Sequence, residues 1–267
     1  MTGSMSDQGA PIELTMYGSL TCEDTAIARS RLIALGVPYH EIDIDADPAG
    51  LARVIELEGH RVTPTIVAGD ATPISEPTIE RLEAYARDAG NRFERPLAKR
   101  LIGPVADRPL PLWTVARARG GDFNLREMRG RLGAALLFAH DASCLACFGY
   151  ARQLAASADA MAEVDSRPIV VIRDEVGAAH GWAEEMAADV VVLADPDGSW
   201  GTAVRARVGA PADGVLLLIT DRYAAPRAVA AAPEAGGLIS PDDALGWLGH
   251  LALECPECGN DVVWSMA

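Results

Sequence analysis

A local pattern that occurs twice constrains the fold of this chain more than any other feature. A short apolar run leads through a turn to a cysteine, and a segment with helical spacing follows. In the first half the run is residues 12–17 and the cysteine is Cys22; in the second half the run is residues 134–140, and Cys144 and Cys147 open the helix. A buried strand that leads directly into a helix is the beginning of an α/β unit. The repetition predicts two α/β domains, and 267 residues suit two domains of ordinary size.

The first half is expected to continue in the order β-α-β-α-β-β-α. Glycine and proline mark the boundaries: Gly36 ends the first helix, Pro48 opens the second, and Pro64 stands against an apolar strand. The expected strands are 12–17, 39–44 and 62–67 with a fourth after the turn at 69–70, and the expected helices are 25–35, 47–58 and 76–89.

The second half alternates strands and helices again, after a charged, proline-containing linker. Its last helix has a strong start signal, because Ser240 caps it and Pro241 occupies the first position. The alternation predicts a mainly parallel or mixed sheet covered on both faces. We expect a first domain over 11–90, a linker over 91–108, a second domain over 109–253 and a tail over 254–267. The expected strands of the second domain are 134–140, 169–173, 190–193 and 215–220, followed by a turn and edge partner over 221–227. Its expected helices are 144–161, 178–187, 200–208 and 240–254.

Composition and charge exclude several classes of partner. The chain is 49% hydrophobic with a net charge of −15, and nucleic acids and anionic membranes would repel such a surface. The longest apolar run, residues 215–219, is far shorter than the roughly 18 residues of a membrane span, and the polar first ten residues show no secretory signal. We therefore expect a cytoplasmic protein without nucleic-acid or membrane partners. Its five cysteines are then expected to serve redox or metal chemistry.

The pair Cys144 and Cys147 carries the clearest chemical signal. A cysteine at the N-terminus of a helix lies in the positive field of the helix dipole, which favours the nucleophilic thiolate. In a C-x-x-C sequence the second thiol can reach the first and resolve a mixed disulfide. By position we assign Cys144 as the attacking thiol and Cys147 as the resolving thiol. The alternative is a buried structural pair, since cysteine packs as a small hydrophobe. His140 either tunes the thiolate or, as is commoner, is a half-buried residue at a strand end.

Cys22 occupies the same place in the first domain, but Thr25 stands where a resolving cysteine would be. Cys22 therefore cannot carry out dithiol exchange without a second thiol from elsewhere. Glu23 and Asp24 lie next to the thiol, and their negative charges disfavour its thiolate. Two interpretations stay open: a monothiol site served by an external or interdomain thiol, or a domain that keeps the fold and has lost activity.

Four segments of the first half resemble one family in their order and spacing. They are Tyr17-Gly-Ser-Leu-Thr-Cys22-Glu-Asp-Thr25, Gly36-Val-Pro-Tyr39, Glu41-Ile-Asp-Ile-Asp45 and Gly59-His-Arg-Val-Thr63-Pro64-Thr65. Over residues 12–88 they resemble the glutaredoxins, especially the actinobacterial mycoredoxin type. The resemblance implies a thioredoxin fold. It also implies that Thr63 and Pro64 form a cis-proline loop beside Cys22, whose backbone groups pair with a substrate peptide or glutathione.

Five segments of the second half also resemble one family: Pro109-Leu-Pro-Leu-Trp113, residues 122–131, Phe138-Ala-His-Asp-Ala-Ser-Cys144, Asp195-Pro-Asp-Gly198 and Leu216-Leu-Leu-Ile-Thr-Asp-Arg222. Over residues 109–253 they resemble the peroxiredoxins of the alkyl hydroperoxide reductase/thiol-specific antioxidant group, in the looser sense of redoxin-like proteins. Peroxidatic sites of that group read Pro-x-x-x-Thr-x-x-Cys. Neither cysteine fits, because Leu137 and Asp141 precede Cys144 at these positions and His140 and Cys144 precede Cys147.

The C-terminal pair Cys255 and Cys258 follows the last helix. It is a redox relay, one half of a zinc site, or inert. In a thioredoxin fold the last helix begins near the active-site end of the sheet, and about 14 helical residues span roughly 20 Å. We therefore expect Cys255 to lie far from Cys144 and to meet Cys22, another subunit or an outside partner.

These features together predict two tandem thioredoxin-fold α/β domains, each with a central mixed sheet flanked by helices. The expected function is thiol–disulfide oxidoreductase activity at Cys144 and Cys147, with peroxide reduction as a less favoured addition. The expected partners are a thiol or disulfide substrate and a protein or low-molecular-weight thiol reductant. No cofactor is expected, and a homodimer stays open. The competing hypothesis is a non-enzymatic scaffold or regulator with a zinc half-site at Cys255 and Cys258.

Overall fold

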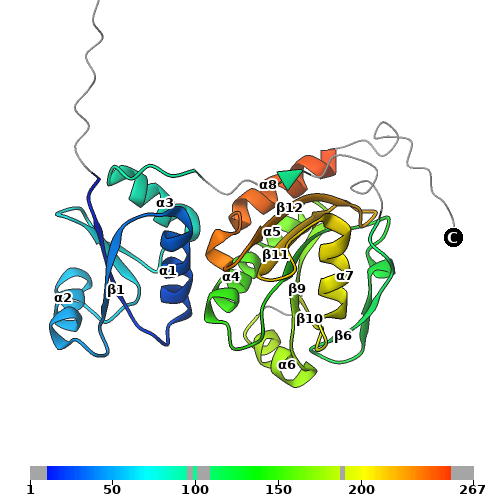
Figure 1. Ribbon diagram of the computed structural model, residues 1–267, viewed down its shortest axis with the longest axis horizontal. Coiled ribbons are helices and arrows are strands. Elements are labelled where there is room, and N and C mark those ends of the chain that lie inside the picture. Colours follow the sequence, from blue (N-terminus) through cyan, green and yellow to red (C-terminus); the bar gives the residue numbers. More distant parts are fainter. Residues whose placement is uncertain (1–10, 95–98, 101–108, 187–189, 254–267) are drawn as a thin grey trace, which may run out of the picture. The chain divides into compact units, whose positions relative to one another are not determined.

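The chain divides into two structural units, residues 1–95 and 96–267, and each unit has its own sheet. The computed structural model describes residues 11–94, 99–100, 109–186 and 190–253 (Figure 1). Within this described part, no helix combines the length and the apolar composition that crossing a bilayer requires.

The first unit is a four-stranded sheet with helices on both faces. The strand order is β2-β1-β3-β4; β1 and β2 are parallel, whereas β3 runs antiparallel to both β1 and β4. Helices α1 and α3 lie on one face and α2 on the other (Figure 1). The elements are β1 (Leu14–Gly18), α1 (Glu23–Leu35), β2 (Tyr39–Asp43), α2 (Pro48–Glu58), β3 (Thr65–Ala68), β4 (Ile74–Ser75) and α3 (Ile79–Asp88).

Local signals set the helix boundaries of the first unit. Gly36 adopts a positive φ of 64° at the end of α1, a conformation that costs glycine little. The Asp47 side chain accepts a hydrogen bond from the backbone N–H of Ala49 and so caps α2. The helix predicted to start at Glu76 starts three residues later, because Glu76 has a positive φ of 44° and Thr78 provides the cap.

The core of the first unit lies between the sheet and helices α1 and α3. It contains an ion pair as well as apolar side chains: the Arg31 guanidinium of α1 and the Glu83 carboxylate of α3 are hydrogen-bonded to each other and fully buried. The apolar members include Leu14, Met16, Leu32, Ile66 and Leu82.

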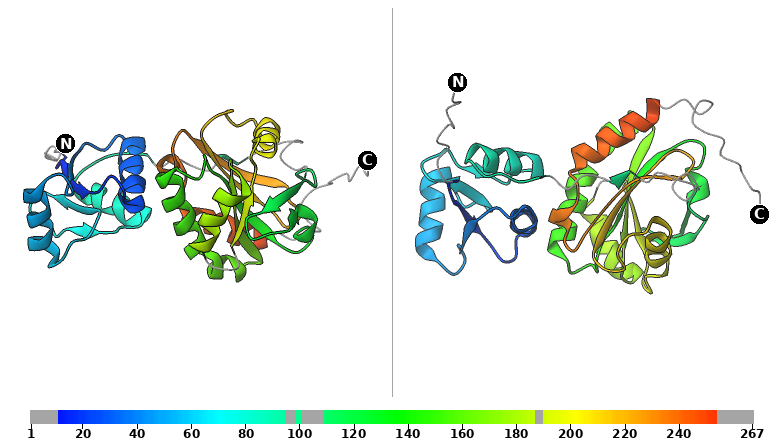
Figure 2. Two further views of the ribbon diagram at one scale, coloured as in Figure 1. Left: turned by 90° about the horizontal axis from the view of Figure 1, so that it is seen from below. Right: turned by 45° about the horizontal axis from the view of Figure 1, so that its top comes forward.

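The second unit has an eight-stranded sheet in the order β5-β12-β11-β8-β9-β10-β6-β7. Helices α4 and α8 lie on one side of the sheet and α7 on the other (Figures 1 and 2). The strands are β5 (Lys99–Arg100), β6 (Thr114–Arg117), β7 (Asp122–Asn124), β8 (Gly133–Phe138), β9 (Ser166–Ile172), β10 (Val191–Ala194), β11 (Val215–Thr220) and β12 (Pro226–Ala232). The helices are α4 (Leu145–Ala156), α5 (Ala158–Ala162), α6 (Val176–Glu184), α7 (Ser199–Val208) and α8 (Pro241–Leu253), with short 3₁₀ turns at Leu125–Glu127 and Ala235–Gly237.

The two sheets share one topology at their centres. In the second unit the strands β9-β8-β11-β12 repeat the order and directions of β2-β1-β3-β4, with β8 and β9 parallel and β11 antiparallel to its neighbours. This is the thioredoxin fold, so the predicted fold class is confirmed. Strands β8 and β11 are buried along their whole length, because helices cover both faces of the sheet.

The edges of the second sheet differ from the prediction. Strands β6 and β7 form a hairpin that is not among the predicted elements, and Gly120 and Gly121 make its turn with positive φ angles of 90° and 75°. Strand β5 pairs with β12, although its residues lie within the predicted linker. The helix predicted over 144–161 is two helices, α4 and α5, with a break at Ser157. Strand β12 occupies residues 226–232, so the edge partner extends beyond the predicted turn and edge segment at 221–227.

Candidate active site

The thiol of Cys22 lies at the N-terminus of α1, directly after the turn that follows β1. Cys22 is the N-cap residue, with extended backbone angles and a half-buried side chain. Its Sγ donates a hydrogen bond to the backbone oxygen of Thr63 at 3.4 Å. The Thr63–Pro64 peptide bond is cis, as the family resemblance implies. The structure therefore brings together Cys22, Thr63 and Pro64.

The residue at the resolving position, Thr25, supports the turn before Cys22. Its buried Oγ1 accepts the backbone N–H of Ser19 at 3.3 Å. The Ser19 hydroxyl in turn donates to Asp45 at 2.6 Å, and this bond together with the Arg61 guanidinium holds the pKa of Asp45 below its usual range. Gly18 leaves room for the arrangement, because a Cβ there would lie 2.5 Å from the Thr25 methyl group. Thr25 therefore has a structural role.

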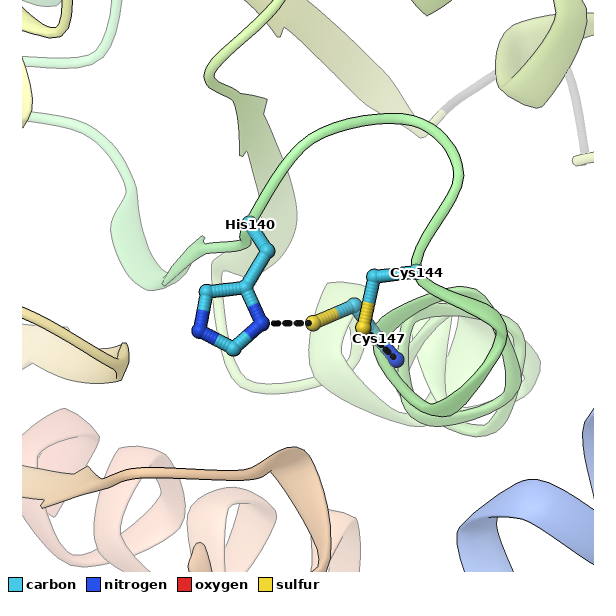
Figure 3. A group of neighbouring side chains, drawn as sticks. All are labelled: His140, Cys144 and Cys147. Carbon is cyan, nitrogen blue, oxygen red and sulfur yellow. Dashed lines mark hydrogen bonds between the residues drawn. The ribbon is translucent and has the colours of Figure 1, made fainter.

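The thiols of the second unit lie at the start of α4 (Figure 3). Cys144 is the N-cap residue, and its Sγ accepts the backbone N–H of Cys147 at 3.4 Å. Cys144 is half-buried, whereas Cys147 is completely buried. Both cysteines are free rather than joined in a disulfide. The outer cysteine can thus meet a substrate, whereas the inner cysteine is closed to solvent.

The imidazole of His140 lies against this pair. Its Nδ1 is 3.5 Å from Cys147 Sγ, and the Nε2 edge of the ring points away from both sulfurs (Figure 3). On sequence grounds a histidine that is merely half-buried at a strand end is the commoner case. The structure instead gives the ring a direct contact with the buried thiol, because the chain between His140 and Cys144 folds back over the first turn of α4.

This environment separates the acidities of the two thiols. The pKa of Cys144 falls from 9.0 to about 5, chiefly because the Cys147 thiol donates a hydrogen bond to the Cys144 thiolate; His140 and the Cys147 N–H add to this, and burial opposes it. The pKa of Cys147 is raised by the same hydrogen bond and by burial. At neutral pH the thiolate is therefore on Cys144 and the proton on Cys147. An attacking cysteine needs to be a thiolate, and a resolving cysteine can stay protonated until the mixed disulfide has formed.

Two residues distant in sequence hold the loop before Cys144. The backbone N–H of Ala142 donates to the Asp174 carboxylate at 3.2 Å, and the indole N–H of Trp182 donates to the Ala142 oxygen at 2.9 Å. The Trp182 ring also packs on Phe148 of α4, with 5.1 Å between ring centroids. Sequence reasoning did not find Asp174 or Trp182. No local signal could have found them, because each meets the loop only through the tertiary fold.

A cavity of about 220 Å³ adjoins His140 at the carboxyl ends of β8, β9 and β10. Arg173 and Arg205 line it, together with Asp213 and Gly214 of the loop before β11. This loop precedes the strand that corresponds to β3, so it takes the place that Thr63 and Pro64 have in the first unit. Among the described residues the Thr63–Pro64 bond is the only cis peptide. The described part of the second unit therefore lacks a cis-proline loop at its dithiol.

The C-terminal Cys255 and Cys258 lie outside the described residues, so the relay and zinc alternatives for them stay predictions. Within the described part, the atoms able to bind a metal come together at the dithiol. His140, Cys144 and Cys147 each offer one ligand atom, and these three atoms lie within 4.8 Å of one another.

Several solved structures have a similar fold. Peroxidoxin BcpB from Mycobacterium tuberculosis is 17% identical, with a TM-score of 0.45, over 55% of this chain and 95% of its own. A secreted Mycobacterium tuberculosis disulfide oxidoreductase homologous to E. coli DsbE is 21% identical, with a TM-score of 0.41, over 52% of this chain and 96% of its own. A Plasmodium vivax 2-Cys peroxiredoxin in its reduced form is 16% identical, with a TM-score of 0.46, over 55% of this chain and 81% of its own.

The chain has no significant match among curated proteins. A family model described as Glutaredoxin matches residues 14–71, the segment that contains Cys22, Thr63 and Pro64. The first unit of this chain is therefore similar to the glutaredoxins over these residues.

Proposed function

We propose that the second unit is a thiol–disulfide oxidoreductase, with Cys144 as the attacking thiol and Cys147 as the resolving thiol. One observation carries the proposal: the half-buried Cys144 thiol accepts a hydrogen bond at a helix N-terminus while its partner Cys147 lies fully buried behind it. An accessible thiolate paired with an inaccessible thiol favours sequential attack and resolution over two independent reactions.

The reaction balances with these groups alone. The Cys144 thiolate attacks one sulfur of a substrate disulfide, so a Cys144–substrate disulfide forms and the other half leaves as a thiolate. Cys147 then loses its proton and attacks Cys144 Sγ, which releases the second half of the substrate as a thiolate and leaves a Cys144–Cys147 disulfide. His140 Nδ1 is the nearest base for the Cys147 proton, at 3.5 Å from its Sγ. Two electrons pass to the substrate, and a thiol reductant, either a protein or a small molecule, returns them.

A trapping experiment tests the assignment of the two roles. In the full chain treated with dithiobis(nitrobenzoate), we expect the Cys144 thiolate of Cys147→Ser to attack the reagent disulfide, release one thiobenzoate and keep the other as a mixed disulfide, because the resolving thiol is absent. Cys144→Ser should form no such adduct at Cys147, since that thiol is buried. Cys22→Ser is the matched control and should keep the activity of the second unit in insulin reduction with dithiothreitol. Equal trapping by the Cys144→Ser and Cys147→Ser proteins would contradict the assignment. Unreactive thiols at both positions would favour the non-enzymatic scaffold.

Peroxide reduction at Cys144 is a weaker extension of the same chemistry. The thiolate would take one oxygen from a hydroperoxide to give a sulfenic acid and an alcohol, and Cys147 would then condense with it to a disulfide and water. The proline and threonine expected before a peroxidatic cysteine are absent, with Leu137 and Asp141 at those positions. We therefore expect disulfide exchange to be much faster than peroxide consumption, which a competition assay on reduced protein measures directly.

We propose a monothiol role for Cys22 as a second function. The contact between Cys22 Sγ and the Thr63 oxygen places the thiol beside the cis-proline loop, and the glutaredoxin model covers these residues. Glutathionylation of reduced protein, followed by mass spectrometry, tests this role. We expect a removable adduct on Cys22 that is absent in Cys22→Ser, whereas a Cys22 that stays unmodified would mark an inactive domain.

A further inference from the structure

The reduced dithiol and His140 form a set of soft ligands that disulfide exchange does not by itself require. The thiol sulfurs of Cys144 and Cys147 and the Nδ1 of His140 lie within 4.8 Å of one another, and Figure 3 shows the nitrogen pointing at the Cys147 sulfur. Two thiolates with an imidazole are the donors that Zn²⁺ and Cu⁺ prefer. We propose that the reduced His140–Cys144–Cys147 cluster binds one thiophilic d¹⁰ ion, either Zn²⁺ or Cu⁺.

The distances suit such an ion with little rearrangement. Bonds of about 2.3 Å to sulfur and about 2.0–2.1 Å to nitrogen place neighbouring ligand atoms roughly 3.5–3.8 Å apart around a tetrahedral centre. The separation of 3.5 Å between His140 Nδ1 and Cys147 Sγ already fits this range. Cys144 is half-buried at the surface, so its side chain can rotate to close the remaining gap, and the same opening admits the ion.

The three ligand residues differ in exposure, so the site is open to solvent on one side only. Cys147 is completely buried, and His140 and Cys144 are partly exposed. His140 lies in the loop after β8, and the two cysteines lie at the start of α4. Binding needs the Nδ1 lone pair, so the ring hydrogen must be on Nε2. The ion replaces the thiol protons, which pass to solvent. Three protein ligands complete a Cu⁺ site, whereas Zn²⁺ would add a water molecule at the open edge.

Metal and disulfide exclude one another at this cluster. A Cys144–Cys147 disulfide has no thiolate to offer, so only the reduced protein binds the ion, and by linkage the bound ion protects the reduced state from oxidation. The inference uses the residues of the proposed exchange reaction but does not depend on that reaction, because ligand binding requires no turnover.

The test uses the full chain carrying Cys22→Ser, Cys255→Ser and Cys258→Ser, so that the only cysteines are those of the cluster. Reduced protein is titrated with Zn²⁺ against a chromophoric chelator, with Co²⁺ as the visible probe of coordination, and separately with Cu⁺ against a copper(I) chelator. We expect one ion per chain in at least one arm, and the arm with the higher affinity identifies the ion. Failure of both ions to bind at this stoichiometry overturns the proposal.

Two comparisons test the ligand set, one for the imidazole and one for the thiolates. His140→Asn should weaken affinity by more than the ~10–100-fold typical of losing an outer partner, because it removes a ligand. Protein oxidised with diamide keeps every residue and should bind no ion, which makes it a control that cannot fail through misfolding. Unchanged affinity in His140→Asn would overturn the three-ligand site. Absence of disulfide exchange in the triple serine variant with an intact cluster would refute the proposed function and leave the metal result standing.

Discussion

The hydrogen bond from the Cys147 thiol should determine how the reactivity of Cys144 depends on pH. This bond is the largest cause that lowers the pKa of Cys144 from 9.0 to about 5. We take Cys147→Ala as the perturbation, because it deletes the donor while the backbone N–H and His140 remain. Cys147→Ser is the matched control, since it keeps a hydroxyl donor at the same place. The pKa of Cys144 should be lowest in the parent protein, higher in Cys147→Ser and highest in Cys147→Ala.

The size of the effect follows from thiolate fraction and nucleophilicity. At pH 7 a thiol of pKa about 5 is about 99% thiolate, and one of pKa 9.0 is about 1% thiolate. A Brønsted slope of about 0.4–0.5 makes the less acidic thiolate about 40–100 times more nucleophilic. The two factors nearly cancel at pH 7. At pH 5.5 complete loss of the lowering would slow attack about 25–60-fold, and at pH 9 it would accelerate attack about 20–50-fold.

The assay follows the thiolate fraction of Cys144 and its rate of attack in metal-free protein that carries Cys22→Ser, Cys255→Ser and Cys258→Ser. Absorbance at 240 nm reports the thiolate, and mass spectrometry reports the rate of reaction with 2-hydroxyethyl disulfide, which is neutral throughout. We expect the rate profiles of parent and Cys147→Ala to cross near pH 7, with Cys147→Ser between them. A parent protein that titrates near 9, or an alanine variant that titrates with the parent, would refute the reasoning.

Three further outcomes are expected from other parts of the structure. The free energy of unfolding of the reduced protein should rise relative to that of Cys144→Ser as pH increases from about 5 to about 9, because in this range Cys144 is a thiolate in the folded state only. The difference should disappear as pH falls through about 5, and urea unfolding at several pH values measures it. Gly18→Ala should destabilise the first unit by roughly 1–3 kcal/mol, since its Cβ would lie 2.5 Å from the Thr25 methyl group, and adding Thr25→Ser should restore stability; a double mutant no better than Gly18→Ala would contradict this contact. Glu83→Gln should cost about 3–5 kcal/mol by leaving the buried Arg31 charge uncompensated, whereas the exposed Glu56→Gln should cost less than about 1 kcal/mol; equal denaturation midpoints would show that Glu83 carries no charge in the fold.

The parts of the fold that local sequence encodes could be predicted. Cys22 and Cys144 both cap helices, because an apolar strand followed by a helix start places the intervening cysteine there whatever the rest of the chain does. The hairpin of β6 and β7 could not be recognised in the same way. Its strands have four and three residues, too few for a periodic pattern, and only the glycine turn marks them.

The surroundings of the dithiol depend on long-range packing. Asp174 and Trp182 meet Ala142 across 32 and 40 residues of chain, so no sequence window contains both sides of either contact. His140 is close to Cys144 in sequence, yet its nitrogen contacts Cys147, and the chain reversal that brings them together is a tertiary property. A single sequence can suggest which thiols react but not which groups tune them.

The buried ion pair of the first unit bears on where the Cys22 thiol points. Helix α1 buries residues around much of its circumference, from Thr25 to Leu32, so apolar contacts alone select its rotation about its axis only weakly. A charged pair is far more selective, because turning the helix by one residue, about 100°, would strand the Arg31 guanidinium in an apolar core. Cys22 caps the same helix and turns with it. The buried charge of Arg31, more than two helical turns away, thus fixes the direction in which the Cys22 thiol points toward the Thr63 oxygen.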